Sequence, residues 1–504
     1  MNNLTTILIS PSCIEKKIRL GESLGIRYLH SYLTSKSFNV DILECDFYTD
    51  TNTLIAEKII NYDVVGFSIN YYEQYISVRD ILACMVKIKA EHFPIIIAGG
   101  NYASFKYKSI LDNEILVSYI ILGEGEQALF YLLKSNFDPY SSINIVCREN
   151  YKKHQFIIKE NDYHDVDLNS LPFPTRDKNS FHLNNKHFSL MSSRGCYGDC
   201  SFCSVSSFSK LCNKKFKWRL RSAENVNKEI DYLYKNYNLE AISFLDSTFL
   251  GKDKLSIERA LKIAQKLFEY NIKFSFECRA EVVNYTLFKK LKKLGLCNVF
   301  IGLESGISKG LKAFNKNTTL DCNIRAIKVI KGLSLSVNYG FIIFFPEMDY
   351  QDFIDNLNFL NTNKILSYSA ISNKLIINYG TKYSYRELKK VITIDNGCNI
   401  TYKFKDDRIN KLYKEIKVLC KVFLKYEIEM QKLLFQMQVQ ISNSNIRKEH
   451  NNKITLINNK LNSIYYYIAT ELFHLNTHYS ENSRDYLKLY IESECGVLDK
   501  VLLK

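Results

Sequence analysis

The stretch MSSRGCYGDCSFCSV (residues 191–205) holds three cysteines, Cys196, Cys200 and Cys203, in a C-x3-C-x2-C spacing. Zinc sites usually take four ligands from two spaced pairs. No second pair follows here, although Cys212 leaves a zinc site open. A disulfide is not expected in a reducing compartment. Three thiolates on one loop favour an iron–sulfur cluster, and a four-iron cluster held by three cysteines would keep one iron open for a substrate or cofactor.

Composition limits the class of protein. The chain has 504 residues, 46% of them hydrophobic, so we expect a globular protein of two to four domains. No run of about 18 or more uncharged apolar residues occurs, which predicts no membrane span. The N-terminus lacks the features of a signal peptide, so we expect a cytoplasmic protein with reduced or metal-bound cysteines. The net charge is +15, but the lysines are scattered and no nucleic-acid motif occurs, so a nucleic-acid partner is not expected.

Residues 1–140 alternate strand-like and helix-like segments. Strands are predicted at 5–10, 39–45, 63–69, 93–100 and 116–126. Helices are predicted at 21–36, 77–92 and 126–134. This β-α-β order predicts a doubly wound, Rossmann-like parallel sheet, in which ligands bind at the carboxyl ends of the strands. Small and polar residues fall at those ends: Ser68, Asn70, Gly99, Gly100, Gly123 and Gly125.

These glycines would let a flat or phosphate-bearing ligand approach the backbone, although they could equally do no more than close tight turns. No G-x-G-x-x-G motif follows the first strand, so a dinucleotide is not favoured. Residues 141–184 are expected to be a linker. Within it, residues 143–160 could form a hairpin with its turn at residues 149–154, and LPFPTRD (171–177) is expected to be extended.

Residues 185–374 form a second α/β run. Strands are predicted at 188–195, 241–246, 273–280, 298–306 and 336–346. Helices are predicted at 222–237, 254–270, 286–295 and 322–333. The repeating pairs predict a partial (β/α) barrel of the TIM type, with its chemistry at the carboxyl ends of the strands. The cysteine loop follows the first of these strands. Residues 375–504 predict a mainly helical domain with a loop at 441–453.

At this point the sequence resembles a known family. RGCYGDCSFC looks like the signature of radical S-adenosylmethionine (SAM) enzymes. SLGIRYLHSYL, DVVGFSI, IIIAGGNYA and ILGEGEQAL resemble the cobalamin-binding domain fused to many of these enzymes, and DLNSLPFPTRD resembles their linker. RSAENVNKEIDYLYKNY, FLDSTF, ECRAEVV and GLESGISKGLKAFNK resemble successive barrel elements. Together these pieces cover residues 1–370, whereas residues 375–504 carry no motif that we can match.

The resemblance implies three cofactors: a 4Fe–4S cluster, SAM and cobalamin. Cys196, Cys200 and Cys203 would ligate three irons, and SAM would chelate the fourth through its amine and carboxylate. The reduced cluster would cleave SAM to a 5′-deoxyadenosyl radical that abstracts hydrogen. The residues that the resemblance places at SAM are Phe202, Asp246, Ser247, Arg279, Glu304 and Lys316. The six residues at the strand ends of the first domain would contact cobalamin.

One departure from the family pattern concerns cobalt. The first domain lacks a D-x-H-x-x-G segment, so cobalamin would bind without a histidine ligand from the protein. The implied reaction is C-methylation of a small-molecule or peptide natural-product-type substrate, with electrons from a donor such as flavodoxin or ferredoxin. One alternative is a non-methylating radical rearrangement, dehydration or cyclisation with a vestigial cobalamin domain. Another is a zinc- or cluster-bearing binding protein that does not consume SAM.

Overall fold

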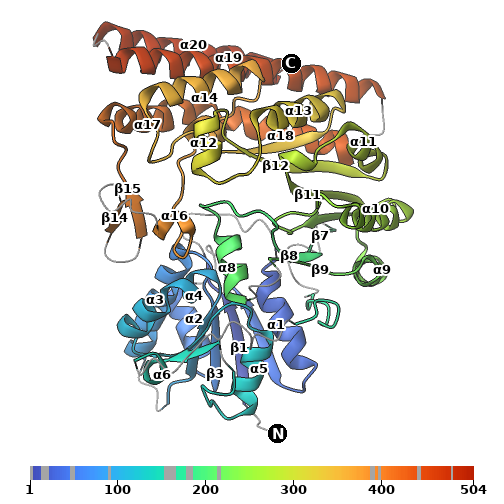
Figure 1. Ribbon diagram of the computed structural model, residues 1–504, viewed down its shortest axis with the longest axis vertical. Coiled ribbons are helices and arrows are strands. Elements are labelled where there is room, and N and C mark those ends of the chain that lie inside the picture. Colours follow the sequence, from blue (N-terminus) through green and yellow to red (C-terminus); the bar gives the residue numbers. More distant parts are fainter. Residues whose placement is uncertain are drawn as a thin grey trace.

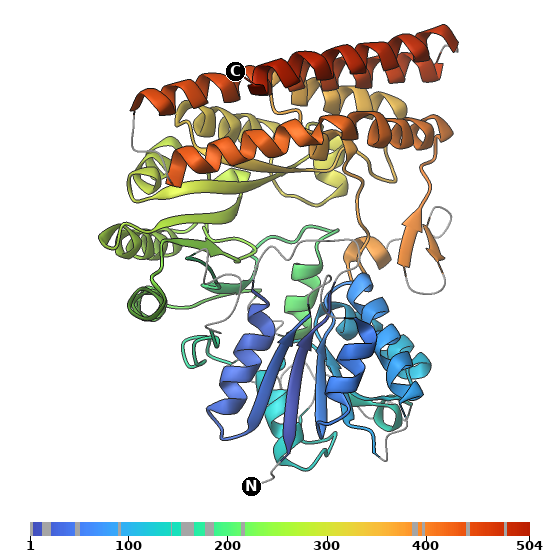
Figure 2. The same cartoon turned by 180° about the vertical axis from the view of Figure 1, so that it is seen from behind.

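The structure is a computed structural model. It describes residues 4–12, 22–45, 51–88, 92–142, 144–152, 166–176, 186–212, 217–385, 392–395, 399–439, 444–477 and 481–503. Three layers follow one another along the long axis of the molecule (Figure 1). A six-stranded sheet lies nearest the N-terminus, a five-stranded sheet lies in the middle, and long helices lie at the far end. The reverse view shows the same order (Figure 2).

The N-terminal sheet has the order β2-β1-β3-β4-β5-β6, and every pair is parallel except β5 with β6. Its strands are β1 (Thr5–Ser10), β2 (Asn39–Glu44), β3 (Val64–Ser68), β4 (Ile95–Gly99), β5 (Val117–Ile121) and β6 (Ile145–Cys147). Its helices are α1 (Leu24–Thr34), α2 (Asn52–Ile59), α3 (Tyr72–Lys87), α4 (Asn101–Asn113), α5 (Glu126–Lys134) and α6 (Arg148–Lys152). The helices bury apolar side chains on both faces of the sheet in two separate cores, so the predicted doubly wound fold is confirmed.

Two details of this domain differ from the sequence prediction. Helices α2 and α4 were not predicted, and both carry weak amphipathic patterns between strands. The hairpin predicted at 143–160 is wrong in its described part, because α6 occupies the first residues of the expected turn. Strand β6 pairs instead with β5, where Tyr119 lies opposite Cys147. The pairing therefore depends on a strand distant in sequence. Residues 143 and 153–160 of the predicted hairpin lie outside the described residues.

The middle sheet has the order β13-β12-β11-β10-β7, with all neighbours parallel. Its strands are β7 (His187–Leu190), β10 (Ala241–Phe244), β11 (Lys273–Arg279), β12 (Leu296–Glu304) and β13 (Ser336–Phe341). Helices α9 (Ala223–Tyr237), α10 (Lys254–Glu269), α11 (Tyr285–Lys293), α12 (Ser308–Ala313), α13 (Leu320–Gly332) and α14 (Tyr350–Thr362) accompany them. Within the described residues, β7 and β13 do not pair with each other, so this is an open, partial barrel.

The strand predicted at 188–195 is two strands. The chain leaves the main sheet after β7 and forms β8 (Ser193–Gly195), which pairs antiparallel with β9 (Trp218–Leu220). The cysteine loop and α8 (Ser204–Cys212) lie between β8 and β9. Figure 1 shows α8 pointing from the barrel toward the N-terminal sheet. This short ribbon therefore carries the cysteine loop to the boundary between the two sheets.

The C-terminal part is mainly helical, as predicted. It contains α15 (Tyr368–Ser372), α16 (Lys382–Tyr385), β14 (Ile392–Asp395), β15 (Asn399–Tyr402), α17 (Asp407–Leu419), η2 (Cys420–Phe423), α18 (Leu424–Val439), α19 (Ser444–Thr477) and α20 (Glu481–Leu503). The loop predicted at 441–453 is wrong from Ser444 onward, where α19 begins with a stretch that is mainly polar in sequence.

The long helices share one hydrophobic core with the barrel, which runs from Phe188 to Leu498. Tyr350 of α14 donates a hydrogen bond to the carbonyl of Phe473 in α19 (2.6 Å), and their rings stack at 4.1 Å. The helices thus complete the outer core of the barrel on the side away from the N-terminal sheet (Figure 2). No helix in the described part of the chain is long and apolar enough to cross a membrane.

This shared core predicts a matched pair of effects in α19. Ile457 is fully buried, whereas its neighbour Leu456 is 55% exposed. We expect Ile457→Ala to lower the free energy of unfolding by about 2–5 kcal/mol, because a buried cavity is left behind. Leu456→Ala should change it by about 0.5 kcal/mol or less. Denaturant unfolding followed by circular dichroism measures both, and equal effects would contradict the shared core.

Candidate active site

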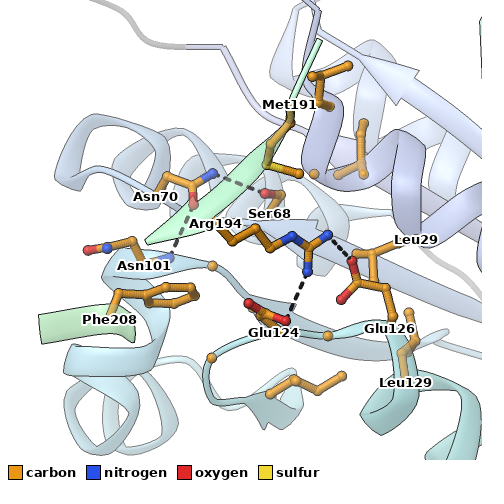
Figure 3. A pocket seen from close by; sticks show the side chains of 18 of the residues that line it. Leu29, Ser68, Asn70, Asn101, Glu124, Glu126, Leu129, Met191, Arg194 and Phe208 are labelled. Atoms are coloured by element: carbon orange, nitrogen blue, oxygen red, sulfur yellow. Dashed lines mark hydrogen bonds and ion pairs between the residues drawn. The ribbon is translucent and has the colours of Figure 1, made fainter. Parts of the chain in front are cut away.

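A cavity of about 370 Å³ lies at the carboxyl edge of the N-terminal sheet. The ends of β1, β3, β4 and β5 line it together with α1 and α5. On the other side it is lined by the ribbon before the cysteine loop, by α8 and by the end of β10 (Figure 3). All six residues predicted at the strand ends line this cavity: Ser68, Asn70, Gly99, Gly100, Gly123 and Gly125. The structure thus brings the predicted edge together as one surface.

The edge is built from backbone and short side chains. Gly100 has a φ of +100°, and a Cβ atom there would lie 2.7 Å from the carbonyl oxygen of Ile69. The Asn70 side chain donates to Ser68 Oγ (3.1 Å) and accepts from the backbone N–H of Asn101 (3.1 Å). Larger residues would fill this edge, so it leaves a flat surface open to a ligand.

The depth of the cavity is apolar. Side chains from the sheet and from α1 and α5 line it there: Leu8, Leu24, Ile26, Leu29, Ile97, Ile121 and Leu129. Gly66 of β3 lies among them, and a Cβ atom there would lie 2.8 Å from the Leu8 side chain. A cavity with an apolar depth and a polar, glycine-rich rim suits a large planar ligand with an apolar body. No histidine is among the described residues that line it.

Charged residues that the sequence analysis did not single out close the side of the cavity toward the cysteine loop. Arg194 of β8 lies 3.0 Å from Glu124 and 2.5 Å from Glu126 (Figure 3). Arg219 of β9 also pairs with Glu124. The signal was present in the sequence, since ILGEGE and SRGC each place charges beside glycines. Only the three-dimensional pairing shows that the two motifs meet.

The cysteine loop is held by main-chain contacts. Cys196 donates its backbone N–H to Lys217 (3.0 Å), and Cys203 donates to Cys200 (3.2 Å). Gly198 donates to the sulfur of Cys196 (3.3 Å). Arg279 donates to the sulfur of Cys200 (3.3 Å). The thiols lie close enough to influence one another electrostatically.

Three cysteines on one loop supply thiolate ligands of the kind that hold an iron–sulfur cluster. Among the described residues, no three Cys, His, Asp or Glu side chains are arranged to hold one ion, although the side chain of Cys212 lies outside them. Burial raises the pKa of Cys203 to about 11 and raises that of Cys196 above its usual value. Buried thiols of this kind ionise when a positively charged centre compensates them, and the irons of a cluster supply that charge.

Three of the residues predicted at SAM form one connected group next to the loop. Lys316 donates to Glu304 (2.8 Å), and the Arg279 guanidinium donates to the Lys316 carbonyl. Burial would lower the pKa of Lys316, but the Glu304 carboxylate raises it. Glu304 has a φ of +68° at a register shift in β12, and this irregularity aims its side chain across the sheet edge. The group therefore offers a carboxylate and a buried cation beside the cysteines.

The other three residues predicted at SAM are placed differently. Asp246 is 1% exposed and accepts hydrogen bonds from the backbone and hydroxyl of Ser192 (3.0 and 2.8 Å) and from Ser193. Ser247 is exposed and lines the cavity. Phe202 packs edge-on against Phe314 at 5.5 Å. Asp246 thus anchors the chain between β7 and β8, while Ser247 faces the open space.

Four exposed residues at or beside neighbouring strands of the barrel sheet form a row: Leu245, Glu277, Phe300 and Asn338. Glu277 is the register partner of Phe300, and Phe300 is the partner of Asn338. Phe300 is 36% exposed, and Leu245, at the end of β10, is 50% exposed. Glu277 is exposed at the sheet surface, but partial desolvation of its carboxyl, together with Glu304 and Asp246, raises its pKa. This carboxyl has no hydrogen bond or ion pair with any described residue. The row is an open, mixed surface at the barrel mouth.

Comparisons with protein families agree with this geometry. The model of the radical SAM superfamily matches residues 190–360, and the model of the B12 binding domain matches residues 20–132. The chain is a radical SAM enzyme with a B12-binding domain. Its cofactors are a 4Fe–4S cluster, SAM and cobalamin. As a radical SAM enzyme it needs a substrate and a reductant.

Curated relatives of this radical SAM enzyme are about a quarter identical to it over the aligned residues. An uncharacterized methyltransferase of Pyrococcus horikoshii is 25% identical over 78% of this chain and 86% of its own. The 4′-phospho-dehydrooxetanocin synthase of Priestia megaterium is 26% identical over 72% of this chain, which spans about half of that relative (52%). The hopanoid C-3 methylase of Methylococcus capsulatus is 24% identical over 68% of this chain and 65% of its own.

Solved structures show the same fold. The cobalamin-dependent SAM radical enzyme OxsB, with aqua-cobalamin and SAM bound, has a TM-score of 0.73 at 20% identity and covers 99% of this chain and 79% of its own. The radical SAM methyltransferase TsrM from Kitasatospora setae has a TM-score of 0.56 at 13% identity and covers 71% of each chain. The OxsB match extends through the C-terminal helices, for which the sequence carried no motif.

Gly195 offers a direct test of the geometry of the cysteine loop. It has a φ of +81°, and a Cβ atom there would collide with the carbonyl oxygen of Lys217. We expect Gly195→Ala to lower the free energy of unfolding by at least about 1–2 kcal/mol and to reduce the iron bound after reconstitution. Gly332→Ala is the control, because nothing lies within 4 Å of its added Cβ. Unchanged iron content in Gly195→Ala would show that the loop is not built in this way.

Proposed function

We propose that this protein is a cobalamin-dependent radical SAM enzyme that methylates an unactivated carbon of a small-molecule or peptide substrate. The observation that carries the proposal is the shared cavity. Its glycine-rich edge comes from the B12-binding sheet, and its opposite side comes from the ribbon and helix that flank the three cysteines. A ligand in this cavity would lie beside both the cysteine loop and the barrel mouth.

In this proposal, Cys196, Cys200 and Cys203 hold the cluster. Arg279 donates to the sulfur of Cys200, and a cation beside a ligating thiolate stabilises its charge. Lys316 and Glu304 bind the carboxylate and the ribose or amine of SAM, as charge complementarity favours. When bound, the reduced cluster supplies one electron to SAM, and cobalamin supplies the methyl group.

The cobalamin contacts that we propose follow the lining of the cavity. Ser68, Asn70 and the glycines at the ends of β4 and β5 form the polar rim. The apolar depth would suit an apolar, planar part of cobalamin, and the polar rim would suit its hydrogen-bonding groups. Since no histidine is among the described residues that line the cavity, we propose that the protein supplies no histidine ligand to cobalt.

We place the substrate against the exposed row of Leu245, Glu277, Phe300 and Asn338. Two apolar side chains beside a carboxylate and an amide bind a molecule that has an apolar body and a hydrogen-bond donor or cation. Leu245 also lines the cavity, so the row and the proposed cobalamin site are continuous. Since the row holds no free cation, an anionic group of the substrate is not favoured at this position.

The names of relatives support methylation and also one alternative. Two relatives are called a methyltransferase and a methylase. Others are called a synthase and an anaerobic magnesium-protoporphyrin IX monomethyl ester cyclase, and these names favour radical chemistry without methylation as the second candidate. For the electron donor we propose flavodoxin or ferredoxin, and for the location the cytoplasm, where thiols stay reduced.

Product analysis tests the proposal. The protein is purified without oxygen, the cluster is rebuilt, and cobalamin, reductant and SAM are added. We expect both 5′-deoxyadenosine and S-adenosylhomocysteine, because methylation consumes one SAM for the radical and another for the methyl group. Formation of 5′-deoxyadenosine alone would favour the second candidate, and absence of both products would contradict radical chemistry.

A cysteine pair provides the matched control. We expect Cys200→Ala to bind less iron than the wild type and to reduce 5′-deoxyadenosine to the level of a protein-free mixture, since it removes a proposed cluster ligand. Cys84→Ala, in α3 of the other domain, should keep both. If Cys200→Ala binds as much iron as the wild type, the proposed ligand set is wrong.

A further inference from the structure

The cobalamin cavity and the cysteine loop are joined through one small element, the ribbon of β8 and β9. In its antiparallel register, Arg194 lies opposite Arg219, and Gly195 lies opposite Trp218. Both arginines reach out of the ribbon to the loop after β5, where they pair with Glu124. Ion pairs from Arg194 and Arg219 therefore connect the ribbon to Glu124 at the wall of the cavity.

The ribbon is also connected to the cysteine loop. Cys196 follows Gly195 directly, and its backbone N–H donates to Lys217, the residue before β9 (3.0 Å). Arg194 thus lies two residues before the first proposed cluster ligand. Glu124 and Glu126 lie beside Gly123 and Gly125 on the proposed cobalamin edge. A displacement of the ribbon would move both proposed sites.

The ion pairs between the ribbon and the loop after β5 are largely buried. The side chains of Arg194 and Glu124 are each 13% exposed, and that of Glu126 is 4% exposed. Burial alone would raise the pKa of Glu126, but Arg194 holds it below its usual value. The ring of Tyr28 in α1 covers the guanidinium at 5.5 Å. Because the fork of arginine bonds two carboxylates at once, lysine cannot replace its geometry.

We propose that Arg194 is a positioning residue that couples the two cofactor sites, so that cobalamin binding and cluster assembly each strengthen the other. This inference rests on the proposed function, because it requires both cofactors to bind. A ligand that orders the loop after β5 also orders the ribbon through Arg194. The second ligand then loses less conformational entropy when it binds. By linkage, the two cofactors must raise each other's affinity by the same factor.

The coupling is measured on the full-length protein, prepared without oxygen with and without its cluster. Hydroxocobalamin is titrated into both forms, and binding is followed by the fluorescence of Trp218, the single tryptophan of the chain, which lies in the ribbon. We expect the cluster-loaded form to bind cobalamin roughly 5- to 150-fold more tightly than the cluster-free form. Equal affinities in the two wild-type forms would overturn the inference.

The variants assign the coupling to Arg194. We expect Arg194→Lys to bring the ratio of the two affinities close to one, since lysine keeps the charge but cannot hold both glutamates. Arg79→Lys is the control, because Arg79 pairs with Asp80 on the surface of the B12-binding domain and is 51% exposed. If Arg194→Lys keeps the wild-type ratio, the coupling does not pass through this residue. Glu126→Gln removes one of the two ion pairs of Arg194 and keeps the ion pair with Glu124. It should reduce the ratio of the two cobalamin affinities. This variant tests the role of Arg194 if Arg194→Lys does not fold.

A second readout follows from reciprocity. Cobalamin should slow the loss of cluster iron to a chelator in the wild type but not in Arg194→Lys. Failure of the proposed function gives a different result. If the wild-type protein binds no cobalamin in either form, the proposal of a cobalamin-dependent enzyme is contradicted. If the wild-type protein binds cobalamin with equal affinity in both forms, only the proposed coupling is contradicted.

Discussion

Two buried ion pairs of one arginine, Arg176, orient the two sheets relative to each other. Arg176, in the extended segment between the domains, bonds to Glu22 before α1 and to Glu229 in α9 (3.1 Å), and all three side chains are 1% exposed. Charges this deeply buried are stable only when each is compensated, and removal of one partner typically costs about 3–5 kcal/mol. Arg176 therefore holds the B12-binding domain and the barrel together in one arrangement. The carboxyl edge of the N-terminal sheet then faces the ribbon that carries the cysteines.

This arrangement explains why the site is shared. Each parallel sheet can bind ligands only beyond the carboxyl ends of its strands. The cavity receives the ends of β1, β3, β4 and β5 from one sheet and the end of β10 from the other. The C-terminal helices lie on the far side of the barrel, and none of their described residues lines the cavity (Figure 1). A nearer segment does approach the cysteines, because Tyr383 donates its backbone N–H to Ser201 (2.8 Å) and Lys382 pairs with Asp199.

The sequence predicted those features that depend on local pattern. Alternating apolar runs located the main strands, and the glycines at Gly99, Gly100 and Gly123 marked the edge that lines the cavity. It did not predict that the strand before the cysteines divides, because β8 is defined by its pairing with β9. It also missed Glu124 and Arg194, which become informative only when two distant motifs meet.

The same reasoning explains the errors at the end of the chain. The start of α19 is mainly polar, so its sequence resembles a loop, whereas later turns of the helix pack against α14. Asp246 has the position expected for a SAM ligand, yet its oxygens accept hydrogen bonds from Ser192 and Ser193. A sequence position alone does not show whether a carboxylate faces the cavity or anchors the backbone; its role at SAM stays a prediction.

The most direct measurement is the location of cobalt in crystals of the protein grown with cobalamin, from anomalous scattering at the cobalt absorption edge. We expect a single cobalt peak in the cavity between the glycine-rich edge at Gly99–Gly100 and helix α8. A cobalt peak elsewhere would contradict the proposal that the two domains share one active site. The absence of a cobalt peak from the cavity, in crystals of protein saturated with cobalamin, would contradict it as well.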